Sequence, residues 1–312
     1  MVDLSQPNTV VLYVDPDRLL PHTDPFNRQI TIGLGCFLEV LRMAALQDGL
    51  NVDFDLFPNG SDPNALDTRR VAICRFAQSV AAPDPLFAHV LNRRSLKVPF
   101  DITRAVPDAT LASIFSAAIH GSVTSTTNAQ VDIDEMRILS REALRIEIET
   151  PLTYKESVDL FWIGRHEVDA NPDGIDFTGP MFEGLPRAGM FNREIALDTS
   201  STAYQQGLMA VYANTDTAMG YVWQVTPANT REDQIQAGQD WVRINLAATA
   251  LGIATQPLSQ ALQEYPKMQG SCTDVHRRLA LEGGTVQMWA RLGYGPQTPA
   301  SPQWPLEEKI VG

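Results

Sequence analysis

The sequence predicts a mixed α+β fold with two domains or one large one. Residues 8–14 are rich in β-branched and aromatic side chains, and residues 51–57 alternate apolar and polar side chains, as strands do. Residues 24–48 and 230–252 instead place apolar side chains at helical spacing. A chain of 312 residues with 44% hydrophobic residues can bury a substantial core, so these elements are expected to pack into a globular protein.

The first part of the chain alternates between these two kinds of element. Asp24-Pro25 offers an N-cap and a first-turn proline for a helix that Gly49 ends. Gly33 and Gly35 lack the third glycine of a dinucleotide-binding loop, so they indicate close packing of this helix. The expected order is strand, helix, strand, strand and short helix, over residues 8–14, 24–48, 51–57, 70–76 and 83–91.

The rest of the chain is predicted to contain longer helices. Thr230 and Asp233 form a variant capping box, and the helix that follows is apolar on most sides, so it is expected to be the central core helix. Thr150-Pro151 should break a helical stretch, because proline cannot continue the hydrogen-bond ladder. Helices are expected over residues 108–120, 132–163, 230–252 and 264–281, and strands over residues 218–226 and 286–294.

Two segments have no regular pattern. Residues 171–189 are rich in glycine and proline and are predicted to form a lid over a pocket, with a plain long connection as the alternative. Residues 295–312 carry four prolines and are expected to form an extended arm against a neighbour.

Composition excludes several classes of function. A net charge of −13 argues against nucleic acid and against anionic membranes. No apolar run is long enough to cross a bilayer, and the first residues lack the pattern of a signal peptide, so a cytoplasmic location is expected. The three cysteines and five histidines have no metal-ligand spacing, and neither a metal site nor a disulfide is predicted.

A basic segment over residues 92–101 stands out in this acidic protein. Arg93, Arg94 and Lys97 surround Ser95, and this set of cationic and hydroxyl donors suits a phosphate group. A solvated basic loop between two helices is the alternative. Both interpretations remain open on the residues alone.

Several motifs together resemble the tandem nitroreductase-fold proteins of the Acg type. The motifs are Asp24-Pro25-x-x-Arg28, Gly33-x-Gly35-x-Phe37-Leu38-x-x-Leu41-x-x-Ala44-Ala45, Trp241-x-Arg243-x-x-Leu246-x-Ala248-Thr249-x-x-Gly252 and Arg291-Leu292-Gly293-Tyr294-Gly295. The resemblance covers nearly the whole chain. It implies an α+β nitroreductase-like fold of two fused half-domains, residues 1–91 and 92–312. These halves would form an intrachain pseudo-dimer with FMN at their junction.

The resemblance also implies the residues of a cofactor site. Arg93 and Lys97 would neutralise the flavin phosphate, and Ser95 would donate a hydrogen bond to it. Gln256, Pro257, Leu258 and Ser259 would lie against the flavin ring, where backbone amides steady negative charge, and Arg291 would lie on the phosphate side. No catalytic residue is identified.

The sequence departs from the family at its start. The usual N-terminal segment with its His-Asn-x-Gln-Pro-Trp motif is not found, and neither is a phosphate turn in the first half. The resemblance implies an FMN-dependent oxidoreductase that passes hydride from NAD(P)H to a small acceptor. A non-catalytic protein that binds or sequesters flavin, or has lost it, is the alternative. The acceptor, the preference between NADH and NADPH, and the choice between a pseudo-dimeric monomer and a homodimer stay open.

Overall fold

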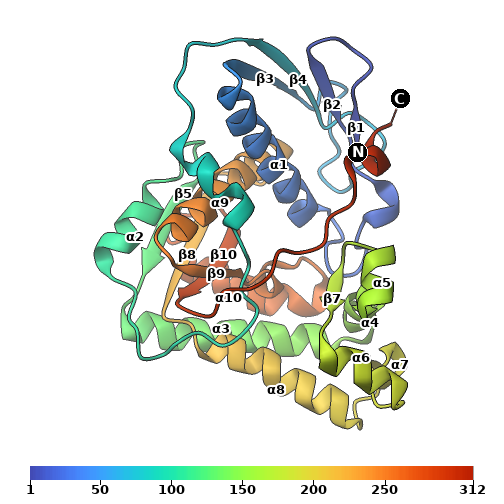
Figure 1. Cartoon of the computed structure of the whole chain (residues 1–312). Helices are drawn as coiled ribbons and strands as arrows, with labels where there is room; N and C mark the ends of the chain where they lie inside the picture. The colour runs from blue at the N-terminus through green and yellow to red at the C-terminus, as the bar shows by residue number, and fades with distance from the viewer. Residues whose placement is uncertain (312) are drawn as a thin grey trace.

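Two antiparallel sheets of four strands each lie on either side of a central pair of helices (Figure 1). The computed structural model describes residues 1–311. The first sheet has the order β1-β2-β4-β3, with strands Val2–Asp3, Thr9–Leu12, Ala72–Gln78 and Leu50–Leu56. The second sheet has the order β5-β8-β10-β9, with strands Val123–Thr127, Gly220–Thr226, Thr285–Gly293 and Ala254–Pro257. The central helices are α1 (Arg28–Gln47) and α9 (Arg231–Ala250).

The first sheet and α1 form the elements that the sequence predicts. Helix α1 begins at Arg28, four positions later than expected, and Asn27 is its N-cap residue. The Asp24 carboxylate still caps the helix, because it accepts hydrogen bonds from the Gln29 and Ile30 amides at 3.2 and 3.0 Å. The expected short helix is the 3-10 helix η2 (Pro85–Asn92), and a further 3-10 turn, η1, spans Pro16–Arg18.

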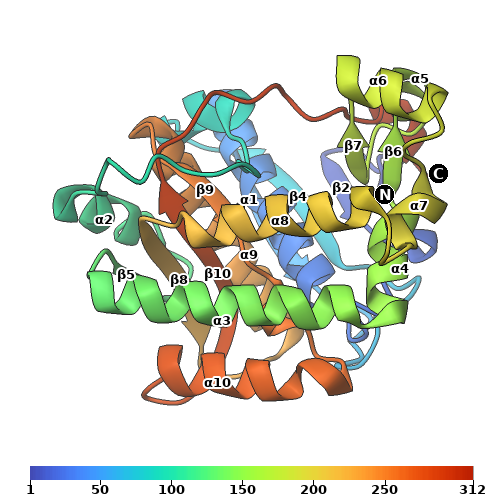
Figure 2. The ribbon, with the colours of Figure 1, turned by 90° about the horizontal axis from the view of Figure 1, so that it is seen from below.

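Helices cover both faces of the second sheet. Trp241, Ile244 and Ala248 of α9 pack on one face, while α3 (Gln130–Glu149) and α10 (Gln269–Leu279) pack on the other. Figure 2 shows α3 between α8 (Thr202–Asp216) and α10. Short 3-10 turns, η3 (Gln260–Leu262) and η4 (Pro266–Met268), connect β9 to α10.

Several of the predicted boundaries in this part are confirmed, and three are wrong, among them the start of the helix predicted over residues 264–281, where α10 begins at Gln269. The capping box of Thr230 and Asp233 is present, and Thr150 separates α3 from α4 (Pro151–Asp159). Helix α2 (Asp108–Phe115) ends before residue 120, and residues 161–163 form strand β6 instead of continuing a helix. The edge strand β5 and helix α8 are elements that the sequence analysis missed.

The tract at residues 171–189 is structured, so its interpretation as loop is wrong. It contains strand β7 (Ile175–Phe177), which pairs in parallel with β6 (Phe161–Ile163), and helix α6 (Pro180–Arg187). Together with α4, α5 (Arg165–Ala170) and α7 (Arg193–Leu197), these elements form a small unit around a cluster of phenylalanine rings. Its role as a lid stays a prediction.

The arm after β10 runs back along its own chain. The Pro299 carbonyl accepts a hydrogen bond from Arg94, and the Trp304 indole donates to Asp173 at 2.6 Å. After η5 (Leu306–Lys309), Ile310 pairs in parallel with Val2, and the Val311 amide donates to the Val2 carbonyl at 2.8 Å. The arm therefore extends the first sheet of the same chain; residue 312 lies outside the described residues.

Helices α1 and α9 cross where each has a glycine. A Cβ atom on Gly35 would lie 2.2 Å from the Ile235 carbonyl oxygen, and one on Gly238 would lie 1.9 Å from that of Ile32. The two contacts are reciprocal, because both pairs of positions are 203 residues apart (238 − 35 and 235 − 32). Both helices have 20 residues and both begin with an arginine. The close packing predicted from Gly33 and Gly35 is confirmed at Gly35 and is wrong at Gly33, where an added Cβ atom would meet no neighbouring segment within 4 Å.

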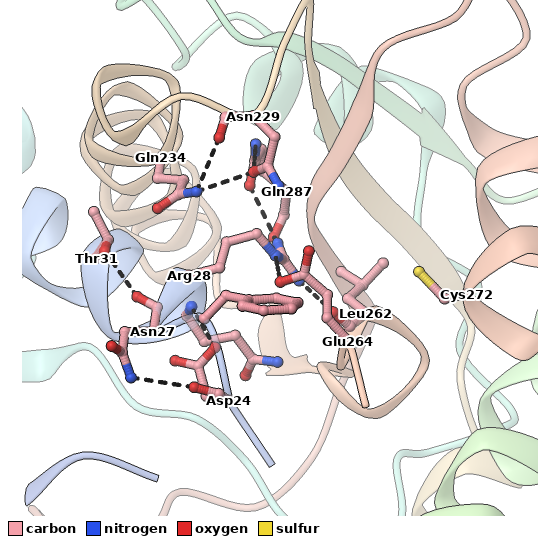
Figure 3. Close-up of polar contacts among 12 residues, drawn as sticks. Asp24, Asn27, Arg28, Thr31, Asn229, Gln234, Leu262, Glu264, Cys272 and Gln287 are labelled. Atoms are coloured by element: carbon pink, nitrogen blue, oxygen red, sulfur yellow. Dashed lines mark hydrogen bonds and ion pairs between the residues drawn. The ribbon is translucent and has the colours of Figure 1, made fainter. Parts of the chain in front are cut away.

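Arg28 of α1 and Arg231 of α9 each donate hydrogen bonds to the part of the chain that carries the other sheet. Arg28 donates to the Leu262 carbonyl and to the Gln287 side chain at 3.1 Å, in the part of the chain that carries the second sheet (Figure 3). Arg231 donates to the carbonyls of Phe26 and Asp62 at 2.8 and 3.0 Å, in the part that carries the first sheet. Each arginine thus satisfies backbone carbonyls in the part of the chain that carries the other sheet.

A buried ionic cluster forms a second link between α1 and α9. Glu39 is 0% exposed and lies 2.9 Å from Arg243, 2.6 Å from Arg42 and 3.0 Å from His120. Burial alone raises the pKa of Glu39, but hydrogen bonds from Arg42, His120 and Arg243 outweigh it and lower the pKa to about 2. Asp84, the N-cap of η2, also contacts Arg243, at 2.6 Å.

We expect this cluster to make the free energy of unfolding depend on pH in the acidic range. The folded pKa of Glu39 is lower than its unfolded value, so its contribution is present above about pH 4.5 and is lost as the pH falls towards 2. Glu39→Gln should lower the free energy of unfolding by on the order of 3 kcal/mol at pH 7. Urea unfolding at pH 7, 4.5 and 3 would show the difference shrinking below pH 4.5. The control is Glu142→Gln, which removes an exposed surface pair. A difference that does not vary with pH would contradict the assignment.

Candidate functional site

The basic turn lies against strand β9. Ser95 forms a parallel bridge with Thr255, and the Leu96 amide donates to the Thr255 carbonyl at 2.9 Å. On the other side of β9, Gln256 pairs with Arg291 of β10. The structure therefore brings together the basic turn, the segment 256–259 and Arg291, which are far apart in the sequence.

The cations of the turn are not neutralised by the protein. Among residues 1–311, neither Arg93 nor Lys97 has a carboxylate within 4 Å. Arg94 instead donates to the carbonyls of Leu91 and Pro299, and its place in the fold is structural. In an acidic protein, unpaired cations on one turn favour an anion site over a plain solvated loop.

The charge of Arg93 acts on helix α1. Burial raises the pKa of the Cys36 thiol on α1 to about 12, and the positive charge of Arg93 opposes this rise. Such an interaction requires the guanidinium to be close to α1. Lys97, by contrast, is exposed. Of the two cations, Arg93 is half-buried and Lys97 is exposed.

The four residues that were expected along the flavin ring differ in what they can offer. Pro257 has no amide hydrogen, and the Leu258 amide donates to the Trp289 carbonyl at 2.8 Å. Pro257 therefore offers no amide donor, and the Leu258 amide is already used within the chain. Among residues 1–311, no hydrogen bond from the Ser259 amide is found, so this amide can still serve a ligand. Gln256 uses its side-chain oxygen to accept from Arg291.

Gln29 of α1 is a residue at this site that the sequence analysis missed. Its side-chain nitrogen lies 3.4 Å from the Ser259 carbonyl oxygen, so helix α1 reaches the segment 256–259. Nothing in the local pattern of the helix marks this position, because the contact depends on how α1 and α9 cross.

Arg291 is completely buried. Its guanidinium donates to Gln256, Thr217, Leu96 and Val98, and it lies 3.7 Å from the centre of the Phe100 ring. Burial lowers the pKa of Arg291 to about 9. No carboxylate lies within 4 Å of it among the described residues.

The residues present fit a phosphate-bearing cofactor at the turn. Besides the unpaired cations, Thr255 is 1% exposed and its hydroxyl oxygen has no hydrogen-bond partner in the part of the chain that the structure describes. Buried polar atoms are normally satisfied, so such an orphan beside Ser95 is compatible with a ligand. The cavity of about 340 Å³ lies elsewhere, at Met1, Tyr13 and Val311, and no predicted site residue lines it.

Known proteins are similar to this chain in sequence. No protein-family model matches the sequence. A Mycobacterium tuberculosis protein named "Putative NAD(P)H nitroreductase acg" is 26% identical over 322 aligned positions, which cover 98% of this chain and 87% of that protein. The chain is similar to Acg over nearly its whole length. The uncharacterised protein Rv3127 of the same organism is 23% identical and covers 96% of the chain and 81% of its own length.

Solved structures of nitroreductases are also similar. The FMN-dependent nitroreductase NfnB from Mycobacterium smegmatis, solved with NADPH, aligns with 73% of this chain and 97% of its own at 17% identity and a TM-score of 0.46. A nitroreductase with bound FMN from Bacteroides fragilis aligns with 71% and 94% at 13% identity and a TM-score of 0.40. The similarity to Acg in sequence confirms the predicted resemblance, and the α+β nitroreductase-like fold class is confirmed with it.

Proposed function

We propose that this protein binds FMN and acts as an NAD(P)H-dependent oxidoreductase of nitroreductase type on a small acceptor. The observation that carries the proposal is the turn of Arg93, Ser95 and Lys97, which lies against β9 with its cations unpaired within residues 1–311. The full-length similarity to Acg supports it.

The chain's own residues would bind and orient the cofactor. Arg93 and Lys97 would neutralise the phosphate, and the Ser95 hydroxyl would donate a hydrogen bond to it. The free Ser259 amide would face the ring from one half, and Gln29 would hold that segment from the other. When bound, FMN supplies the hydride chemistry, and the protein provides binding, orientation and exclusion of water.

We also propose that the chain is an intrachain pseudo-dimer of residues 1–91 and 92–312 with a single flavin site. The matching strand orders and the constant offset between α1 and α9 support the pseudo-dimer. With that offset, Gln256 corresponds to Asp53, whose ladder partner is Arg75. Arg75 contacts the Asp55 carboxylate at 3.3 Å. Asp53 and Asp55 therefore give the first sheet carboxylates at positions where the second sheet has none. The negative charge of these carboxylates disfavours phosphate binding in the first sheet.

We infer a cytoplasmic location. Among residues 1–311, α1 is the helix long and apolar enough to cross a membrane. It packs against α9 and the first sheet, as the core helix of a globular protein does.

Two segments that pack against the basic turn, the arm and α8, favour a second function. Gly295 of the arm approaches Leu96 so closely that a Cβ atom would lie 2.4 Å from its side chain, and Asn214 of α8 donates to the Lys97 carbonyl at 3.0 Å. Segments that close over a bound flavin would exclude a substrate. The alternative is thus a protein that holds flavin without turnover, or has lost it.

The visible spectrum of the purified full chain separates these functions. We expect a flavin absorption band, about one FMN released per chain on denaturation, and bleaching of the band by NADH or NADPH without oxygen. A yellow protein that neither nucleotide bleaches would favour the alternative. A colourless protein that takes up no FMN on reconstitution would overturn both functions, and two FMN per chain would contradict the single site.

A further inference from the structure

Arg291 connects three segments of the proposed site through one guanidinium group. Its Nη2 atom donates to the carbonyls of Leu96 and Val98 at 3.2 and 2.8 Å, on either side of Lys97. Its Nε atom donates to the Gln256 side chain at 2.7 Å. Its Nη1 atom lies 3.3 Å from the hydroxyl of Thr217, the C-cap of α8. The basic turn, the ring-side segment and the end of α8 therefore share one donor group.

The same contacts use four of the five N–H groups of Arg291, so it has no parallel pair of free N–H groups to offer a phosphate. A direct ligand needs N–H groups that point at the phosphate oxygens, usually two of them in parallel. All three guanidinium nitrogens of Arg291 are directed at atoms of this chain, and the Phe100 ring lies against the guanidinium at 3.7 Å. The side chain is 0% exposed.

We propose that Arg291 is a positioning residue that keeps the phosphate turn and the ring-side segment in register, and that it does not contact the phosphate. This inference rests on the proposed FMN site. Because Arg291 holds both neighbours of Lys97, it fixes the backbone from which Lys97 extends. Because it also holds Gln256, a change at Arg291 disturbs the segment along the ring.

Charge gives Arg291 a second effect on the site. A buried cation without a carboxylate partner is costly, and an anion at the adjacent turn reduces that cost. Anion binding and the charge of Arg291 are therefore coupled, even without a direct contact.

Riboflavin, which has the ring but no phosphate, distinguishes positioning from direct binding. The dissociation constants of FMN and riboflavin would be measured on the flavin-free full chain by quenching of flavin fluorescence. Arg93→Ala is expected to weaken FMN about 10- to 100-fold and to leave riboflavin nearly unchanged. Arg291→Met is expected to weaken both flavins, each about tenfold or more, because both sides of the site lose their support. Near-UV circular dichroism would show that the variants remain folded.

Other outcomes overturn the inference. If Arg291→Met weakens FMN alone, Arg291 acts on the phosphate and does not position the ring-side segment, and if it weakens neither flavin, Arg291 has no role in the site. If Arg291→Met does not fold, Arg291→Lys and Gln256→Leu replace it: each removes contacts that join the two segments, and each must weaken both flavins. A wild-type chain that binds neither flavin would instead contradict the proposed function itself.

Discussion

Replacing Arg93 and Lys97 together by alanine is expected to reduce FMN affinity by a factor of roughly 100 to 10,000. Each residue would contribute a charge-assisted hydrogen bond to a dianionic phosphate, and such bonds are worth about 1.5–3 kcal/mol each. Neither side chain has a carboxylate partner in residues 1–311 that its loss would leave unpaired, so the fold should remain intact. Titration of the flavin-free protein with FMN, together with thermal unfolding, checks both parts.

The control for this double variant is Lys267→Ala with Arg277→Ala. It removes the same two charges from η4 and α10, away from the turn. If the control weakens FMN as much as the double variant does, the effect is one of net charge and the phosphate has been misplaced. Raising the salt concentration should weaken FMN binding to the wild-type chain more than to the double variant.

Gly238→Ala is expected to destabilise the protein by about 3 kcal/mol or more. The added methyl group would lie 1.9 Å from the Ile32 carbonyl oxygen, and the obstacle is backbone, which cannot rotate away. The two central helices must separate, and the buried residues between them would lose contact. Urea unfolding measures the change, with soluble yield as a second readout.

Gly33→Ala on α1 is the matched control. No atom lies within 4 Å of the position where its Cβ would be, so the only change is the helix preference of alanine over glycine. We expect Gly33→Ala to stabilise the protein by about 0.5–1 kcal/mol. Equal effects of the two substitutions would show that α1 and α9 do not cross as closely as the structure has them.

Strong periodicity made part of the fold predictable. The strands at β2, β3, β4, β8 and β10 and the helices α1, α3 and α9 each carry a clear pattern. Strand β5 reads Val-Thr-Ser-Thr-Thr, which is polar because it lies at the edge of its sheet. Helix α8 buries Tyr204, Asn214 and Thr215, so it has no apolar stripe to detect.

Turn residues misled the interpretation of residues 171–189. Gly179 and Pro180 look like a loop, yet they form the N-cap and the first position of α6. Proline is well suited to the first turn of a helix, where its missing amide hydrogen is not needed. The same residue types therefore serve a loop and a helix start, and the phenylalanine cluster that decides between them is formed by tertiary packing.

The proposed anion turn is suggested by its residue types alone, while the contacts that support it could not be predicted from the sequence. Arg93, Ser95 and Lys97 are close in sequence, and their chemistry is evident from their order. The internal role of Arg291 depends on its register opposite Gln256, and the contact of Gln29 depends on the crossing of two helices. Pairing between distant segments determines both, and a local pattern contains no such information.

The return of the arm to β1 has a consequence for how the protein folds during synthesis. Val2 pairs with Ile310, so the outer edge of the first sheet stays open until synthesis has reached Ile310. At ribosomal rates of about 5–20 residues per second, this interval is roughly 15 to 60 seconds. Strand β1, although it is made long before Ile310, thus stays without its partner for this interval, and its unpaired edge is where we expect a nascent chain to meet chaperones or aggregate.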